Sequence, residues 1–251
     1  MAESGAALVP LRPAGESGDA ERPFCADVST TGGSFVDNGA PEHHVVWHDC
    51  AAGAIHWGPL SAVAAVEPIA TTSCQKDFEV RLTGAVPNGH TGPDACARWT
   101  GICLAVDTLR CAEIVGAGRW LHGDALGYAH QRAQFGRPIA EYQAVQHELA
   151  TQLSWVDGAE LVVRRALTAL AEGHGAQEAA RAGAFVREKA WQVLFASYNI
   201  LGGVGFVEET PVNVYCRGIL GLLSQLGPVS DIEERSAEFV RPGAWLATAG
   251  A

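Results

Sequence analysis

The sequence of 251 residues has a shortage of positive charge and no long apolar run. Lys and Arg total 17 against 28 Asp and Glu, which gives a formal net charge of -11. A chain this acidic is poorly suited to binding nucleic-acid phosphates, so we expect no nucleic-acid partner. No apolar run is long enough to span a bilayer, and the start of the chain has neither the basic nor the apolar region of a secretory signal. We therefore expect a cytoplasmic protein without a membrane partner.

Cysteine pairs and common catalytic motifs are also missing. The seven Cys form no C-x-x-C pair, which favours reduced thiols over disulfides or a zinc ribbon. The sequence contains no G-x-S-x-G nucleophile elbow and no phosphate-binding P-loop motif. His43, His44 and His48 lie near an Asp and a Cys, but on a strand His44 and His48 would be about 13 Å apart on one face. We interpret them as an exposed polar strand edge and expect no metal site. Gly116 and Gly118 lack the third glycine of a dinucleotide motif and are expected to allow close helix packing.

The first part of the chain has the pattern of short strands. Residues 77–83 alternate polar and apolar side chains, which predicts a half-buried strand. Residues 44–48 and 54–57 predict two further strands with a glycine-containing turn between them. Residues 1–24 are rich in Pro, Gly and Ala, so we expect a mostly irregular lead-in. These features favour a small antiparallel β-domain over residues 1–97.

From about residue 98 the apolar pattern becomes helical. Four long helices are predicted, over Thr100–Arg132, Ile139–Glu172, Gln177–Leu201 and from after Pro211 to Leu226. The second helix is predicted to bury a stripe of Val145, Leu149, Leu153 and Val156. Long helices with short breaks favour an antiparallel four-helix bundle over residues 98–251. The predicted fold class is therefore α+β.

Two segments at helix ends carry chemistry that suits a cofactor. Residues 128–139 (YAHQRAQFGRPI) combine Arg, Gln and Phe, and Arg offers a donor fork suited to phosphate. Residues 199–206 (NILGGVGF) have consecutive glycines, which let a backbone approach a ligand closely. On the residues alone, an ordinary helix hairpin and an ordinary glycine cap explain these segments equally well.

Taken together, the two segments resemble the acyl-CoA dehydrogenase family. The resemblance runs over residues 98–227 and includes Gln143, His147, Glu209, Pro211 and Arg217. It implies a C-terminal four-helix bundle of that family, preceded by part of the middle β-domain. Family members usually also carry an N-terminal helical domain, and the resemblance implies that it is missing here.

The resemblance implies that FAD is held across a subunit interface by residues of both segments. The implied FAD-binding residues are Arg132, Gln134, Phe135, Gln143, Asn199, Gly202 and Gly203. Asn199 stands where Gln is usual and is one methylene shorter. Beside the flavin ring the resemblance places Phe35 instead of the commoner Trp, and Asp37 instead of a hydroxyl residue.

The usual catalytic base is absent at both positions that the resemblance indicates. The family removes the α-proton of an acyl thioester with a Glu, and these positions fall on Leu226 and Val106, neither of which can accept a proton. Asp107 and Glu113 are substitute candidates, although neither lies at the expected angle and height on the helix. No catalytic residue is therefore assigned.

The leading hypothesis is an acyl-CoA dehydrogenase subunit that supports FAD binding in a heteromer and acts only with a base-bearing partner. The partner would be a full-length acyl-CoA dehydrogenase homologue, and the substrate an acyl-CoA or acyl-carrier thioester. An alternative is a cofactor-free scaffold repurposed to bind or cyclise a biosynthetic intermediate. An oligomer is expected because Trp191, Phe195 and Leu220–Leu223 need cover, unless the core of the bundle itself covers them.

Overall fold

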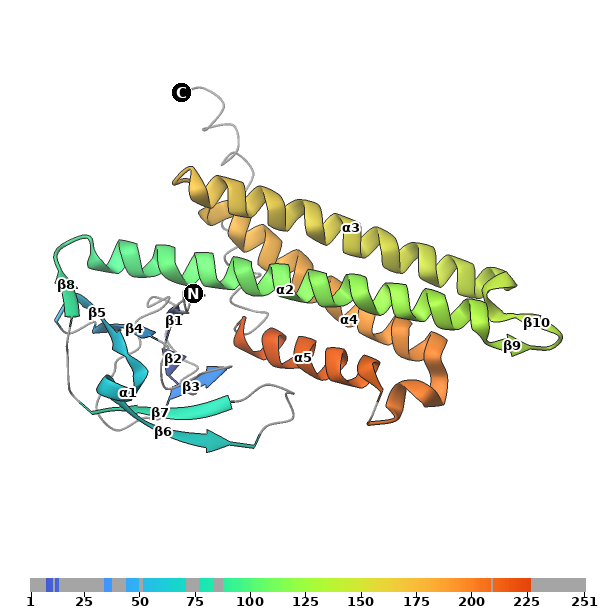
Figure 1. Cartoon of the computed structure of the whole chain (residues 1–251). Coiled ribbons are helices and arrows are strands. Elements are labelled where there is room, and N and C mark those ends of the chain that lie inside the picture. Colours follow the sequence, from blue (N-terminus) through green and yellow to red (C-terminus); the bar gives the residue numbers. More distant parts are fainter. Residues whose placement is uncertain are drawn as a thin grey trace, which may run out of the picture. The chain divides into compact units, whose positions relative to one another are not determined.

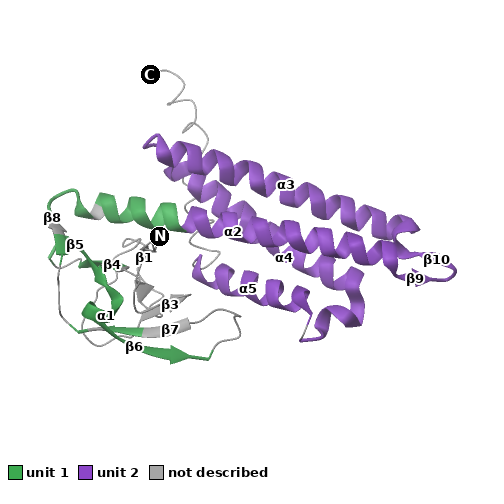
Figure 2. Ribbon diagram, in the orientation of Figure 1, with its two compact units in different colours: residues 1–106 green, residues 107–251 purple. Residues whose placement is uncertain are grey.

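The computed structural model describes residues 8–10, 12–13, 34–37, 44–49, 52–70, 77–83, 88–208 and 210–226. The chain divides into two compact units, Met1–Val106 and Asp107–Ala251, shown in different colours in Figure 2. The units meet inside one continuous helix, so the predicted division between residues 97 and 98 stays a prediction. The predicted class, a small β-domain followed by a helix bundle, is confirmed (Figure 1).

The first unit contains two four-stranded sheets. One has the order β1 (Leu8–Pro10), β4 (His44–Asp49), β5 (Ala54–Pro59) and β8 (Asn88–Thr91); the other has β2 (Arg12–Pro13), β3 (Ser34–Asp37), β7 (Asp77–Leu82) and β6 (Ala64–Ile69). A short helix, α1 (Leu60–Val63), joins β5 to β6. The three predicted strands are present as β4, β5 and β7. One pairing departs from the antiparallel prediction, because β1 runs parallel to β4.

Strand β4 is buried on both faces. Val45 and Trp47 pack with residues of α1 and β7, whereas Val46 packs on the other face with Ile55 and Trp99. Trp99 belongs to the first turns of α2 (Ala95–Gln131). Because α2 covers this second face, neither face of β4 is exposed to solvent.

The prediction of an exposed histidine edge is therefore wrong for His48. Its side chain is 2% exposed, and its ring stacks on that of Trp99 with centroids 6.0 Å apart. Burial lowers its pKa, because the charged form loses water. Among the residues that the structure describes, no three His, Cys, Asp or Glu side chains lie close enough to hold a metal ion.

The second unit is a bundle of long helices. After α2 come α3 (Gln143–Ala171), α4 (Ala176–Leu201) and α5 (Pro211–Gln225), with 3₁₀ turns η1 (Ile139–Glu141) and η2 (Gly202–Phe206) between them. The four predicted helices are thus confirmed, although α2 begins five residues earlier than predicted and the second helix opens with η1. No helix in the described part of the chain is both long and apolar enough to cross a membrane.

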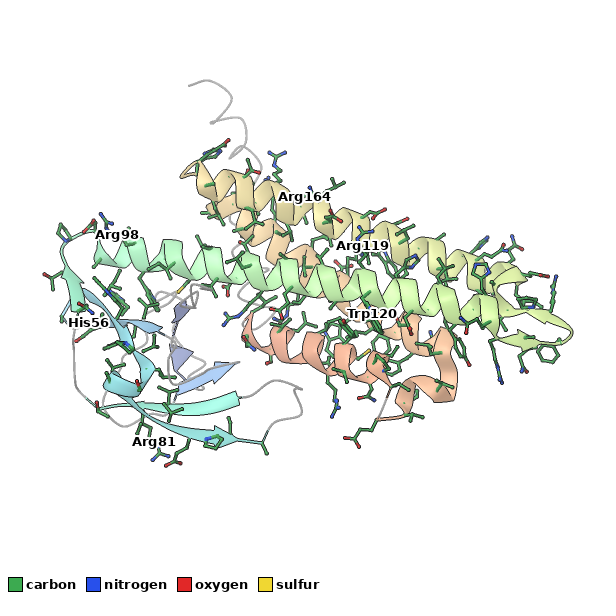
Figure 3. The ribbon with its side chains drawn as sticks, in the orientation of Figure 1. His56, Arg81, Arg98, Arg119, Trp120 and Arg164 are labelled. Atoms are coloured by element: carbon green, nitrogen blue, oxygen red, sulfur yellow. The ribbon has the colours of Figure 1, made fainter. Side chains whose placement is uncertain are left out.

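Gly118 of α2 lies where this helix approaches two others of the bundle. A Cβ atom at Gly118 would lie 3.6 Å from Val193 and 3.7 Å from Val156, so α2 approaches both α3 and α4 there. Gly118 thus lies at a helix contact, as predicted, but a Cβ atom there would make only ordinary van der Waals contacts, and Gly116 faces open space. Further along α2, Trp120 stacks on Tyr215 of α5 with ring centroids 4.0 Å apart (Figure 3).

The buried face of α3 differs from the predicted stripe. Leu149 and Val156 are buried, but Leu153 is 36% exposed, and fully buried Gln152 takes its place in the core. The Gln152 amide donates to Ser197 Oγ at 2.7 Å and to the Val193 carbonyl at 3.1 Å, and its Oε1 lies 3.0 Å from His122 Nδ1. A polar residue can occupy this position because all its hydrogen-bonding groups have partners on α2 and α4.

Candidate functional site

The two segments singled out in the sequence lie at the same end of the bundle. Ala125 and Ala129 near the end of α2, Leu149 near the start of α3 and Ile200 near the end of α4 form one buried cluster, and Ile139 packs against it. The segments that follow α2 and α4 therefore both begin beside this apolar cluster, at the same end of the bundle.

A tight hairpin carries the first segment beyond the end of α2 (Figure 1). Its strands are β9 (Ala133–Gln134) and β10 (Arg137–Pro138), which pair antiparallel. Phe135 and Gly136 form the turn with φ angles of +53° and +85°, as a two-residue type I′ turn requires. Left-handed backbone is unfavourable for a bulky residue such as Phe, which has no local hydrogen bond to offset it. The Phe135 side chain is also 94% exposed, so the hairpin presents an aromatic ring to solvent at a cost in stability.

Tyr142 fixes the position of this hairpin. Its hydroxyl donates a hydrogen bond to the Gln134 carbonyl at 2.9 Å, and the Arg137 guanidinium lies 4.2 Å above its ring. Sequence reasoning missed Tyr142, because its contacts depend on the return of the chain through β10 and η1.

The polar side chains of the first segment, and of Gln143 just after it, are available for a ligand. Arg132, Gln134 and Gln143 are exposed, and their side chains form no hydrogen bond or ion pair with any residue that the structure describes. Exposed guanidinium and amide groups near an aromatic ring suit a ligand with phosphate and ring portions.

The second segment forms the end of α4 and η2. Gly202 has a φ angle of +58°, and a Cβ atom at Gly202 or Gly203 would meet nothing within 4 Å. The packing of the chain therefore gives no reason for glycine at position 203. At Gly205, by contrast, a Cβ atom would lie 2.9 Å from the Tyr198 ring. Asn199 is exposed and donates to Glu148 Oε1 at 3.1 Å, so one side of its amide is already occupied.

The positions implied for a catalytic base offer no acidic group. Leu226, the C-cap residue of α5, is 6% exposed and belongs to the main core of the bundle. Val106 lies on α2 and is partly buried. Asp107 pairs with Arg110 at 3.2 Å on the same helix, and Glu113 is exposed.

Some expected site residues lie outside what the structure describes. Phe35 and Asp37 are on β3, opposite Glu79 and Asp77 of β7, but the side chains of β3 are not among those described. Glu209 is likewise outside the described residues. Arg217 lies on α5, with a terminal nitrogen 3.6 Å from Glu208.

Residues 108–226 match the C-terminal domain of acyl-CoA dehydrogenases. This part of the chain is a C-terminal domain of the acyl-CoA dehydrogenase type. Acyl-CoA dehydrogenase FadE34 of Mycobacterium tuberculosis is 33% identical over 123 residues, which are 48% of this chain and 17% of the relative. Acyl-CoA dehydrogenase IpdE2 of Mycolicibacterium smegmatis is 29% identical over 154 residues, 61% of this chain and 47% of the relative. The chain thus spans less than half the length of these curated relatives.

The fold of acyl-CoA dehydrogenases extends over almost the whole chain. The ChsE4–ChsE5 complex of Mycobacterium tuberculosis contains a similar chain, with a TM-score of 0.71 and 22% identity over 96% of this chain and 64% of that one. At this level of identity the similarity shows the fold alone. The region of similar fold includes the β-rich unit, which the C-terminal domain match leaves out.

Proposed function

We propose that this chain is the base-less, FAD-supporting subunit of a heteromeric acyl-CoA dehydrogenase that desaturates an acyl thioester between its α and β carbons. One contrast carries the proposal: Arg132, Gln134 and Gln143 are exposed and form no hydrogen bond or ion pair with the described residues, whereas the positions of the catalytic base hold Leu226 and Val106. A chain that keeps cofactor-binding groups but lacks the base would complete a neighbour's cofactor site and rely on the neighbour for proton removal.

Loss of the base would strongly reduce activity in the isolated chain. A positioned acid–base group contributes about 10²–10⁴-fold to a proton transfer. Leu226 is packed in the core, so a water molecule cannot replace a carboxylate there without opening the bundle. Asp107 is paired with Arg110, and Glu113 lies about two turns along α2 from Val106. We therefore assign proton removal to a Glu of the partner.

The residues at the end of the bundle fit the implied cofactor. Relatives in this family are FAD-dependent flavoproteins. Arg132 would bind the pyrophosphate, Phe135 would pack against a ring, and the open backbone at Gly203 would allow close approach. Gln134, Gln143, Asn199 and Gly202 would complete this surface. FAD, when bound, supplies the acceptor for the β-hydrogen as hydride.

A heteromer accounts for the chain's incomplete set of site residues. The ChsE4–ChsE5 structure is a complex between two chains, one of which has the fold of this chain. By analogy, the partner would be a fuller acyl-CoA dehydrogenase homologue, and the substrate an acyl-CoA or acyl-carrier thioester.

Co-expression with the fuller homologue encoded nearest to this chain tests the proposal. The tag is placed on this chain only, and the visible spectrum of the purified material is recorded. We expect the homologue to co-elute with bound flavin, and Arg132→Ala to reduce the flavin content. Arg164→Ala is the matched control, because Arg164 is exposed on α3 about 30 Å from the hairpin end of that helix (Figure 3). A colourless chain that elutes alone would contradict the proposal and favour the cofactor-free scaffold.

A further inference from the structure

An open cavity of about 360 Å³ lies within the second unit, beside the two segments assigned to the cofactor. One face of α2 forms a wall of it with Gly123, Asp124, Gly127, Tyr128 and Gln131, and Thr210 at the start of α5 lies in another wall. None of the seven residues assigned to FAD lines the cavity, but Gln131 directly precedes Arg132, and two further lining residues, Leu201 and Val204, flank Gly202 and Gly203.

Asp124 is the charged residue in this lining, and no residue in the described part of the chain pairs with it. Its carboxyl forms no hydrogen bond or ion pair with any of the described residues. Burial raises its pKa, because the charged form loses water. A partly desolvated carboxyl of this kind is stabilised by a cationic group that enters the cavity, and it repels the phosphates of a nucleotide.

Two glycines leave the α2 wall of this cavity partly without side chains. Gly123 and Gly127 are one turn apart on α2, and a Cβ atom at either would meet nothing within 4 Å. Glycine is less favourable than alanine inside a helix, and the packing of this chain does not require it at either position. The glycines therefore leave space for an occupant from outside the described chain to lie against the backbone of α2.

We propose that this cavity receives an Arg or Lys side chain of the partner subunit, and that Asp124 pairs with it. The inference rests on the proposed heteromer, because the cavity adjoins the segments that would face the partner. The Tyr128 hydroxyl and the Gln131 amide supply further polar groups for a guanidinium or ammonium group. The pair would help to set the register in which the two chains associate.

The test measures the dissociation constant of this chain and the fuller homologue at low and high salt, in the presence of FAD. Asp124→Asn is expected to weaken association about tenfold and to reduce the salt dependence of the dissociation constant. A tenfold effect lies between those of an exposed and a fully buried charge pair. Asp157→Asn is the matched control, because Asp157 is exposed on α3 and pairs with Arg119 within the chain. An unchanged dissociation constant for Asp124→Asn would overturn the inference.

Filling the cavity gives a second, independent measurement. Gly127→Leu should weaken association at least as much as Asp124→Asn, whereas Gly116→Leu should not, because Gly116 also faces open space on α2 but lies outside the cavity. Neither change is expected to lower the thermal midpoint, and Gly127→Ala is the milder variant if the larger side chain disturbs folding. Equal loss of association in both leucine variants would contradict the inference.

The outcomes also separate this inference from the proposed function. If no flavin-containing heteromer forms with the wild-type chain, both fail. If it forms and depends on Arg132 but not on Asp124, only the cavity assignment fails. Agmatine, which carries a guanidinium and an ammonium group, serves as a free-amine probe. Binding of agmatine that requires Asp124, together with unchanged association of Asp124→Asn, would show that the cation is not supplied by the partner.

Discussion

The buried amide of Gln152 allows a sharp test of how the bundle is held together. Gln152→Ala removes three hydrogen-bond contacts, to His122, Val193 and Ser197, and leaves a space in a fully buried position. At about 1 kcal/mol for each contact, with a further contribution from the cavity, the free energy of unfolding should fall by about 3–4 kcal/mol.

Gln152→Leu separates the hydrogen bonds from the volume. Leucine nearly fills the space, and the Val193 carbonyl keeps its hydrogen bond from Ser197 Oγ at 2.9 Å. His122 is only partly buried, so water can replace the amide there. We therefore expect a loss of about 1 kcal/mol or less, because no buried group is left without a partner.

Urea unfolding followed by far-UV circular dichroism measures both values, and tryptophan fluorescence shows whether the two units unfold together. Gln146→Ala is the control, because Gln146 is exposed on the same helix and should cost under about 0.5 kcal/mol. Equal losses for the Ala and Leu variants would refute the assigned role of the hydrogen bonds.

Two further predictions concern packing and alkaline stability. Gly205→Ala should reduce stability by about 1–3 kcal/mol in thermal unfolding, because its Cβ atom would lie 2.9 Å from the Tyr198 ring, whereas Gly203→Ala should leave the midpoint unchanged. Burial raises the pKa of the Cys111 thiol from its ordinary 9.0 to about 12, so its contribution to stability is complete below pH 9 and is lost as the pH rises toward 12. The free energy of unfolding should fall over this interval, and more steeply in the wild type than in Cys111→Ala; parallel curves would contradict this.

Local patterns predicted the elements better than they predicted the surroundings of single residues. The ends of the four helices follow from Gly and Pro in the sequence, and the structure confirms them within a few residues. Leu153 and His48 show where local reasoning fails. Leu153 is displaced from the core because Gln152 finds partners on two other helices. His48 is buried because α2, more than 40 residues later, covers its side of the sheet.

The candidate site could be located from the sequence but not built from it. The resemblance pointed to the segments around Arg132 and Gly202, and the structure brings them to one end of the bundle. The hydrogen bond from Tyr142 that holds the hairpin has no signature in a local pattern. The cavity beside Asp124 also depends on two stretches that are distant in sequence, the end of α2 and the chain from Leu201 to Val212. The binding roles of the seven residues stay predictions.

The turn at Phe135 has a consequence for anyone who engineers this chain. Asn is well suited to the left-handed backbone at that position, so Phe135→Asn should relieve strain and remove an exposed aromatic ring at once. A thermostability screen on the isolated chain would select this change as an improvement. The same screen would thereby discard the ring that the hairpin presents to solvent, so selection for heat resistance has to be carried out on the assembled complex.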